Sequence, residues 1–343
     1  MKRKLLIVLC LLCLVLSGCS KKEEKRVLNV LNWSSYIPDE IVRDFEKKTG
    51  IRVNYGTYSS NEELLAKIAN SKEGTYDLIF PSDYMIEIMR NRGLLQTLDK
   101  KRLENYKNID SSYLNLSYDT SNQYSLPFVL ATVLMAVNRD VISDEVTSYS
   151  DLLDSKFKNE IVLLDDQRIV IGMGLLALGY DMNSTNTKEI DEAREFLLEL
   201  KKNIKAFDSD SPKNFLITGE ASIAVIWNAE AALAKEENPN IEIIYPDEGM
   251  ALSVDNFAIL KGSKNTSEAY QFIDYILDGK VMSKIIEAYP YKNVNSEASK
   301  YLSSWYLENP AANISSDIIR KGFFVENIGD KIKLYDRTWA LIK

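Results

Sequence analysis

Seven aromatic and acidic side chains stand at or near the ends of expected strands, where a ligand could meet them. These residues are Trp33, Tyr36, Tyr84, Asp166, Trp227, Asp255 and Tyr289. Aromatic faces attract organic ammonium groups and cover methylene chains, and a carboxylate binds each charged end. A flexible organic dication needs both features. Each residue also has a structural alternative, because Trp227 could lie in the core, Asp166 could cap a turn or helix, and Tyr84 could pack under its own helix.

Several other kinds of chemistry require residues that this sequence lacks. Its 343 residues include no histidine, which excludes a Ser-His-Asp or Cys-His catalytic set and a zinc site with imidazole ligands. No glycine-rich nucleotide-binding loop follows a strand. The adjacent Asp165 and Asp166 would point to opposite faces of an extended segment, so they do not indicate a catalytic pair. We therefore expect no catalytic residue, no metal site and no cofactor.

The charge of the chain speaks against nucleic acid as a partner. Lys and Arg number 42 against 50 Asp and Glu, a net charge of −8, whereas binding to phosphates requires a basic face. Cationic partners are favoured instead. The hydrophobic content of 45% is enough for a sizeable core, and the length suits roughly two domains of 100 to 200 residues.

The N-terminus has the pattern of a secretion signal. Basic residues at positions 2–4 precede the apolar run 5–16, which is shorter than the roughly 20 residues of a membrane-spanning helix. The run ends in Leu-Ser-Gly-Cys at Cys19, which resembles the bacterial lipoprotein processing box. We predict a lipoprotein signal peptide over 1–18, lipidation of Cys19, a tether over 19–26, and an extracytoplasmic protein anchored by lipid to the membrane, in the periplasm or at the cell surface. The alternative is an ordinary secreted protein with a stray cysteine.

Strands and helices alternate from residue 27 onward. Strands are predicted at 27–32, 51–57 and 77–80, and helices begin at Pro38, Ser60 and Ser82. This order predicts a parallel sheet with helices on both faces and ligands at the carboxyl ends of the strands. A second block spans 141–249, with strands predicted at 161–164, 221–227 and 241–245 and helices at 169–178 and 189–200.

Two extended segments, 125–137 and 251–260, flank the second block. Crossing segments on both sides of a complete α/β block are what a hinged, two-lobed architecture requires. We therefore predict an α/β fold of two lobes, each a mixed, mainly parallel sheet flanked by helices, joined by two extended crossovers. Lobe 1 is expected to contain residues 27–133 plus 255–297, and lobe 2 residues 134–254 plus 298–343.

Several short stretches carry a resemblance to a known family. They are LNWSSYIP at 31–38, EKKTG at 46–50, YDLIFPSDYM at 76–85, IWN at 226–228 and YP at 289–290. In order and spacing these resemble the spermidine/putrescine-binding proteins of bacterial ABC importers, over residues 27 to about 330. The resemblance implies a type II periplasmic-binding-protein fold. It also implies a monomer that closes over one polyamine, putrescine or spermidine, and delivers it without chemistry to a permease with ATPase subunits.

The resemblance also implies a set of ligand-binding residues. They are Trp33, Ser34, Tyr36, Ser82, Tyr84, Asp166, Trp227, Asp255 and Tyr289. Three positions depart from the family, because Ser35 stands where some members carry glutamate, Ile169 replaces a glutamate after Arg168, and Ser253 replaces a frequent tryptophan. These departures predict a pocket that is less acidic and less aromatic than that of the best-known spermidine binders. Contacts of Asp166, Asp83 and Ser35 with the ligand, and the preferred polyamine, stay open at this stage.

Other functions compete with polyamine binding. The same fold could bind another small organic cation or an amino-acid-like solute, although an anion binder would place Arg or Lys at the strand ends, where only Arg168 is a candidate. An extracytoplasmic enzyme on this scaffold is disfavoured by the absent histidine. A purely structural or adhesive lipoprotein predicts no small-molecule pocket at all.

Overall fold

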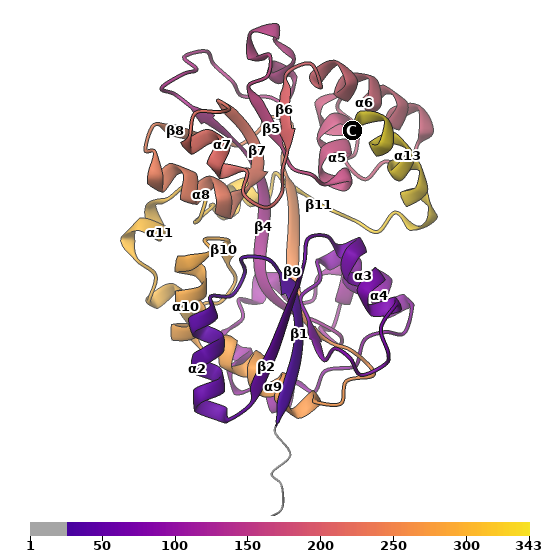
Figure 1. Ribbon diagram of the computed structural model, residues 1–343, viewed down its shortest axis with the longest axis vertical. Coiled ribbons are helices and arrows are strands. Elements are labelled where there is room, and N and C mark those ends of the chain that lie inside the picture. Colours follow the sequence, from indigo (N-terminus) through magenta and orange to yellow (C-terminus); the bar gives the residue numbers. More distant parts are fainter. Residues whose placement is uncertain (1–25) are drawn as a thin grey trace, which may run out of the picture.

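The computed structural model describes residues 26–343. The predicted signal peptide 1–18, Cys19 and the tether up to residue 25 lie outside the described residues. The described part forms two lobes, and the strands β4 (Leu126–Asn138) and β9 (Ala251–Ile259) run from one lobe into the other (Figure 1). The predicted two-lobed α/β fold is confirmed.

The lower lobe of Figure 1 is built on three parallel strands and on β9. The parallel strands are β1 (Val27–Trp33), β2 (Arg52–Tyr58) and β3 (Leu78–Ile79), in the order β2-β1-β3-β9, with β9 antiparallel to β3. Its helices are α2 (Asp39–Thr49), α3 (Asn61–Ala69), α4 (Asp83–Asn91), α9 (Thr266–Ile276) and α10 (Gly279–Ala288). The parallel strands of this lobe end at the side that faces the other lobe, and the antiparallel β9 enters the lobe there (Figure 1).

Local sequence signals account for the first helices. Helix α2 follows Pro38, and it ends at Gly50, whose φ of 69° allows the left-handed cap with its N–H on the carbonyl of Glu46. Helix α3 is capped by Ser60, whose Oγ accepts the N–H of Glu63 at 3.1 Å. Pro38 and Ser60 thus place the start of each helix a few residues after the end of a strand.

Between α4 and β4 the chain makes a series of short turns for which the sequence predicts no element. They are the 3-10 helices η1 (Lys100–Arg102), η2 (Glu104–Asn108), η3 (Ser111–Tyr113) and η4 (Ser117–Asp119). Asp119 orders the last turn, because its carboxylate accepts the backbone N–H groups of Gln123, Tyr124 and Ser125. The segment connects α4 to the start of β4.

The upper lobe of Figure 1 repeats the α/β plan. Its strands are β5 (Ile161–Leu163), β6 (Ile204–Phe207), β7 (Ile223–Trp227) and β8 (Ile241–Ile244). Its helices are η5 (Ser150–Leu153), η6 (Ser155–Phe157), α5 (Gln167–Ala177), α6 (Thr187–Leu200), α7 (Lys213–Ile217) and α8 (Asn228–Glu237). Strand β5 is parallel to β6 and β7, whereas β4 is antiparallel to β7 and β8. Gly174 lets α5 approach α6, since a Cβ there would lie 3.0 Å from Leu197 Cγ.

The two crossing strands form the neck of the molecule. All 13 residues of β4 are buried. Its partner changes along its length, because it pairs with β9 as far as Thr132 and with β7 from Val133 onward. A strand that is central in both lobes ties them together through continuous backbone hydrogen bonds, so that relative movement of the lobes must bend this neck.

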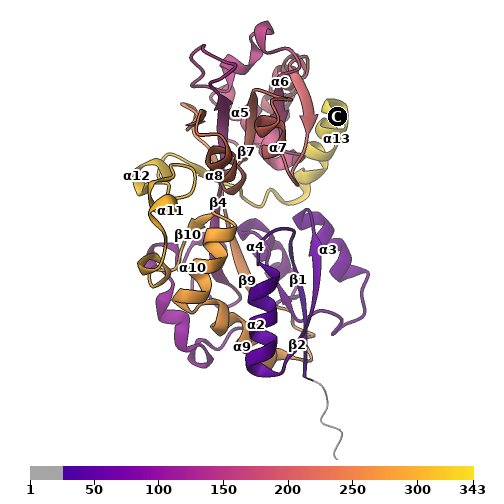
Figure 2. The same ribbon diagram turned by 60° about the vertical axis from the view of Figure 1, so that its left-hand side comes forward.

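The C-terminal part passes along the neck to the upper lobe. It comprises β10 (Lys292–Asn293), η7 (Ala298–Lys300), α11 (Ser304–Glu308), α12 (Ser316–Ile319), β11 (Phe323–Phe324), η8 (Gly329–Lys331) and α13 (Ile332–Ile342). Strand β10 pairs with β4, β11 pairs with β9, and α13 packs on α5 and α6 (Figure 2). Of the helices in residues 26–343, none has the length and apolar content of a membrane span.

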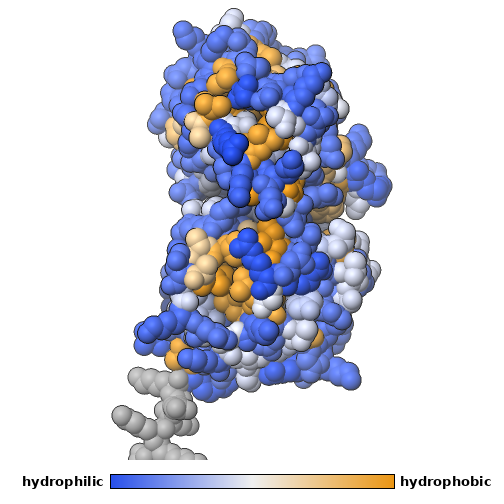
Figure 3. Space-filling model, turned by 90° about the vertical axis from the view of Figure 1, so that its right-hand side faces the viewer, coloured by the Kyte–Doolittle hydropathy of each residue, from blue (hydrophilic) through white to orange (hydrophobic). Residues whose placement is uncertain are grey.

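The surface is mostly hydrophilic. Apolar side chains gather on both lobes, on either side of the waist between them (Figure 3).

Candidate functional site

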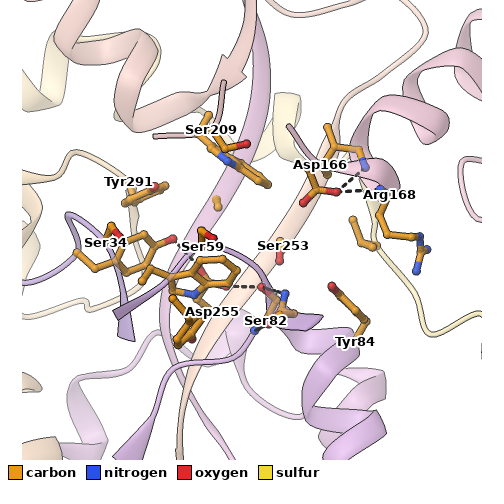
Figure 4. Close-up of a pocket in the computed structure, with 18 of the residues that line it drawn as sticks. Ser34, Ser59, Ser82, Tyr84, Asp166, Arg168, Ser209, Ser253, Asp255 and Tyr291 are labelled. Carbon is orange, nitrogen blue, oxygen red and sulfur yellow. Dashed lines mark hydrogen bonds between the residues drawn. The ribbon is translucent and has the colours of Figure 1, made fainter. Parts of the chain in front are cut away.

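A pocket between the lobes is lined by residues of both (Figure 4). It encloses about 800 Å³, its open mouth included. Trp33, Tyr58 and Trp227, the last residues of β1, β2 and β7, all line it. The pocket thus lies at the carboxyl ends of parallel strands, where open α/β sheets bind ligands.

The structure brings together eight of the nine predicted binding residues. Those that line the pocket are Trp33, Ser34, Tyr36, Ser82, Tyr84, Asp166, Trp227 and Asp255. Tyr289, which caps the C-terminal end of α10, is not among the lining residues. Tyr291, two residues further on, lines the pocket instead, with its ring centroid 4.7 Å from that of Tyr36.

Asp255 is the buried carboxylate of the lower wall. It lies on β9 with 3% of its surface exposed, and it accepts hydrogen bonds from Tyr36 Oη at 2.5 Å and Ser82 Oγ at 2.7 Å. Burial raises the pKa of Asp255 to about 6, and the two hydroxyl donors offset part of that rise. No ion pair of residues 26–343 includes it. Because a buried carboxylate without a cation is costly, this position favours a ligand that brings a positive charge.

Aromatic rings surround this carboxylate. The ring of Trp33 lies 4.7 Å from that of Tyr58 and 6.2 Å from that of Tyr36, measured between centroids. Trp33 Nε1 donates to the carbonyl of Phe80 at 2.8 Å, which fixes the indole plane. The half-buried indole can therefore cover a methylene chain or face an ammonium group.

The upper wall holds further carboxylates. Asp166 caps α5, since its Oδ1 accepts the N–H groups of Arg168 at 2.8 Å and Ile169 at 3.1 Å. Burial raises the pKa of Asp166, and these two bonds oppose the rise. Asp166 is thus a helix cap and a pocket residue at once. The exposed Asp210 and the half-buried Trp227 also line this wall.

Arg168 brings a positive charge to the wall. It is 3% exposed and donates from Nη2 to Asn183 Oδ1 and to the carbonyl of Glu326, both at 2.9 Å. Its guanidinium carbon lies 5.6 Å from the ring of Tyr84 and 5.2 Å from that of Tyr335. Figure 4 shows its head turned away from Asp166. Its Nε has no hydrogen-bond partner among the described residues.

The charges that line the pocket favour a dication. Three carboxylates, of Asp166, Asp210 and Asp255, stand against the guanidinium of Arg168, a formal balance of −2. Among residues 26–343, no group of three or more His, Cys, Asp or Glu residues could hold a metal ion.

The positions that depart from the family pattern divide into two groups. Ile169 and Ser253 line the pocket, as does Val325 of the C-terminal segment. Ser35 is exposed and does not line it, and its φ of 54° places it in a left-handed turn. Asp83 lies behind the wall, 2% exposed, and its Oδ2 accepts the N–H of Val254.

Sequence reasoning missed several lining residues. Tyr58 ends the second strand, and Ser59 and Asn61 come after it. The rule applied to the first and third strands, that ligands meet the carboxyl ends, would have found them. Ser209 and Asp210 lie in the loop after β6, a strand not predicted.

Comparisons with known proteins agree with this geometry. Residues 40–314 match the model of the family described as bacterial extracellular solute-binding protein. The spermidine/putrescine-binding periplasmic protein of Salmonella typhimurium is 36% identical over 313 residues, which cover 91% of this chain and 90% of the relative. The solved structure of PotD, the substrate-binding protein of a spermidine/putrescine ABC transporter from Streptococcus pneumoniae, has a TM-score of 0.79 at 31% identity, with 92% and 98% covered. A PotD lipoprotein of Treponema pallidum has a TM-score of 0.84 at 26% identity, with 92% and 99% covered.

Proposed function

The chain belongs to the family of bacterial extracellular solute-binding proteins, and from this premise we propose that it captures a polyamine between its lobes and delivers it to the permease of an ABC importer. The relative from Salmonella typhimurium binds spermidine and putrescine by its name, and the solved relative from Streptococcus pneumoniae serves an ABC transporter. The ligand leaves the protein chemically unchanged.

The proposal rests on Asp255, which is buried and has no ion-pair partner within the described part of the chain. Its carboxylate receives two hydroxyl hydrogen bonds and is ringed by aromatic side chains. An ammonium group placed there gains a charge-assisted hydrogen bond and an aromatic face. The other end of a diamine then reaches the upper wall, where Asp166 offers a carboxylate across the cleft (Figure 4). Asp210 lines the same pocket. Trp227, Ile169 and Val325 cover the methylene chain between them.

Isothermal calorimetry tests the proposal directly. The chain from residue 20 onward, which contains every described residue, is titrated with putrescine, cadaverine, agmatine, spermidine and 4-aminobutyrate. Saturable 1:1 binding of at least one di- or triamine, and recovery of the ligand unchanged after long incubation, is the expected result. Tighter binding of 4-aminobutyrate than of any amine would instead favour an amino-acid-like ligand, with Arg168 holding its carboxylate.

The location and the partners belong to the same proposal. We place the protein outside the cytoplasm, anchored by lipid on Cys19, with a monomeric body that meets a permease and its ATPase subunits. The lipoprotein from Treponema pallidum supports the anchor. The expected lobes are residues 27–133 plus 255–297 and residues 134–254 plus 298–343. Metabolic labelling with a radioactive fatty acid, compared between the wild type and Cys19→Ala, tests the anchor, which predicts label only in the wild type.

A further inference from the structure

The loop that leads into α4 is bound to β9 by three consecutive hydrogen bonds. They join Asn256 N to Pro81 O at 2.9 Å, Ser82 Oγ to Asp255 Oδ1 at 2.7 Å, and Val254 N to Asp83 Oδ2 at 3.1 Å. Ser82 and Asp255 also form an isolated antiparallel bridge. The bridge thus brings Asp83, the first residue of α4, close to Asp255, on β9.

Neither of these two carboxyls has a counter-charge among the described residues. Asp83 is 2% and Asp255 3% exposed, and no ion pair of residues 26–343 includes either. Asp83 accepts the N–H groups of Tyr84 at 2.8 Å and Val254 at 3.1 Å, and the Ser253 hydroxyl lies close enough to lower its pKa. When two carboxyls share a site that excludes water, ionisation of one disfavours ionisation of the other, and they titrate as a pair.

Across the cleft from Asp255 stand Asp166, Asp210 and Arg168. The titratable groups closest to the pair are tyrosines: Tyr36 from the loop after β1, Tyr58 of β2, Tyr118 of η4 and Tyr291 beside β10, and burial raises the pKa of each. None of them can balance a second negative charge. Burial raises the pKa of Asp83 to about 8, above that of Asp255. The backbone donors oppose this rise, and the negative charge of Asp255 adds to it.

We propose that Asp83 is a positioning residue that holds Asp255 in the cleft wall and that it carries a proton in the empty protein, which it releases when a cationic ligand binds. The ammonium at Asp255 supplies the counter-charge that the pair lacks. Asp83 then passes from carboxylic acid to carboxylate, and its proton leaves to solvent while the ligand keeps its own. This inference rests on the proposed function, because a neutral or anionic ligand would not release the proton.

The sign of the pH dependence follows from this exchange. Proton loss that accompanies binding makes affinity rise with pH for as long as Asp83 is protonated in the empty protein. Putrescine affinity should therefore increase by up to about tenfold per pH unit below pH 8 and level off above it. At pH 7 the wild type should release most of one proton per ligand bound.

Calorimetry in two buffers measures the number of protons released per ligand bound. Putrescine is titrated at pH 7.0 in phosphate and in imidazole, whose ionisation enthalpies differ, and the difference in observed enthalpy gives the protons released. Asp83→Asn should release few protons at pH 7.0, and its affinity should change less than threefold between pH 7 and 8. Asp119→Asn is the matched control, because Asp119 is another buried carboxylate that accepts backbone N–H groups, outside the cleft lining. It should release as many protons as the wild type.

The wild-type measurement decides the matter even where Asp83→Asn does not fold. Binding of putrescine with no proton release at pH 7.0 would overturn the inference and leave the proposed function standing. Equal proton release by Asp83→Asn and the wild type would also overturn it. Failure of every amine to bind would overturn the proposed function and the inference together.

Discussion

Replacing Asp255 by asparagine separates ligand binding from folding. The change removes the negative charge and keeps the size of the side chain. The hydroxyls of Tyr36 and Ser82 can still pair with the amide, because a hydroxyl both donates and accepts. A ligand ammonium, however, would lose its charged partner while staying buried. Truncating one member of such a pair costs about 2 to 5 kcal/mol, which corresponds to roughly 30- to 4000-fold weaker binding.

The same substitution should leave the empty protein at least as stable as the wild type. The pKa of Asp255 rises from 3.8 to about 6 on folding. Since the folded-state pKa is the higher one, ionised Asp255 opposes folding, and its cost grows as pH rises from about 4 and is complete above about 6. That cost is about 3 kcal/mol at full ionisation. The asparagine side chain carries no charge, so the variant should unfold at an equal or higher temperature than the wild type at pH 7.5, and this difference should shrink toward pH 4.

Two measurements test this reasoning together. Calorimetry with putrescine gives the loss of affinity, and thermal unfolding without ligand at pH 4.0 and 7.5 gives the change in stability. Asp119→Asn, which removes a buried carboxylate outside the cleft, should lower the unfolding temperature and preserve affinity. An affinity of Asp255→Asn within threefold of the wild type would refute the site assignment. A variant markedly less stable at pH 7.5 than at pH 4.0, relative to the wild type, would refute the electrostatic argument.

Three further outcomes are expected. Putrescine should bind comparably to spermidine or better, because Ile169 lines the pocket where relatives carry a glutamate that could pair with a third ammonium, and Ile169→Glu should raise spermidine affinity; a hundredfold spermidine preference in the wild type, or about 2.7 kcal/mol, contradicts this. Small-angle scattering should show a smaller radius of gyration with saturating ligand as the neck bends, whereas an unchanged profile counts against closure. Trp227→Ala should weaken putrescine binding by about tenfold, which lies between the values of an exposed and a desolvated cation–π contact; Trp339→Ala, whose ring packs on Phe207 away from the pocket, should leave affinity unchanged in the same titration.

The main elements of the fold could be predicted because local signals and tertiary packing agree there. The helix after Pro38 ends at Gly50 as expected, and the two long apolar segments are β4 and β9. The turns η1 to η4 could not be predicted, because they follow buried side-chain caps such as Asp119 and lack the periodicity of helix or strand.

The site was predictable where a residue directly follows a strand, and less so where a helix ends. Trp33 and Ser82 are fixed by strand ends and reach the pocket. Tyr289 and Tyr291 could not be told apart, because the choice depends on where α10 stops, and helix ends are uncertain by a residue or two. Arg168 was named only as the one candidate for an anion-binding charge at a strand end, and its hydrogen bond to the carbonyl of Glu326 joins residues far apart in sequence and has no local signal.

The position of β9 sets the order in which the chain can fold. Ile79 pairs with Ala258 and Thr132 with Leu252, so the lower sheet is incomplete until residues near 259 of the 343 have left the ribosome. Contacts of such high contact order form slowly, because a long loop must close before they stabilise anything. Strand β4, buried along its whole length, stays without β9 as its neighbour while residues 139–250 are being synthesised. For a chain exported as proposed here, this late closure keeps the polypeptide unfolded long enough to thread through a translocation channel, and it leaves a long apolar strand that a holding chaperone can recognise.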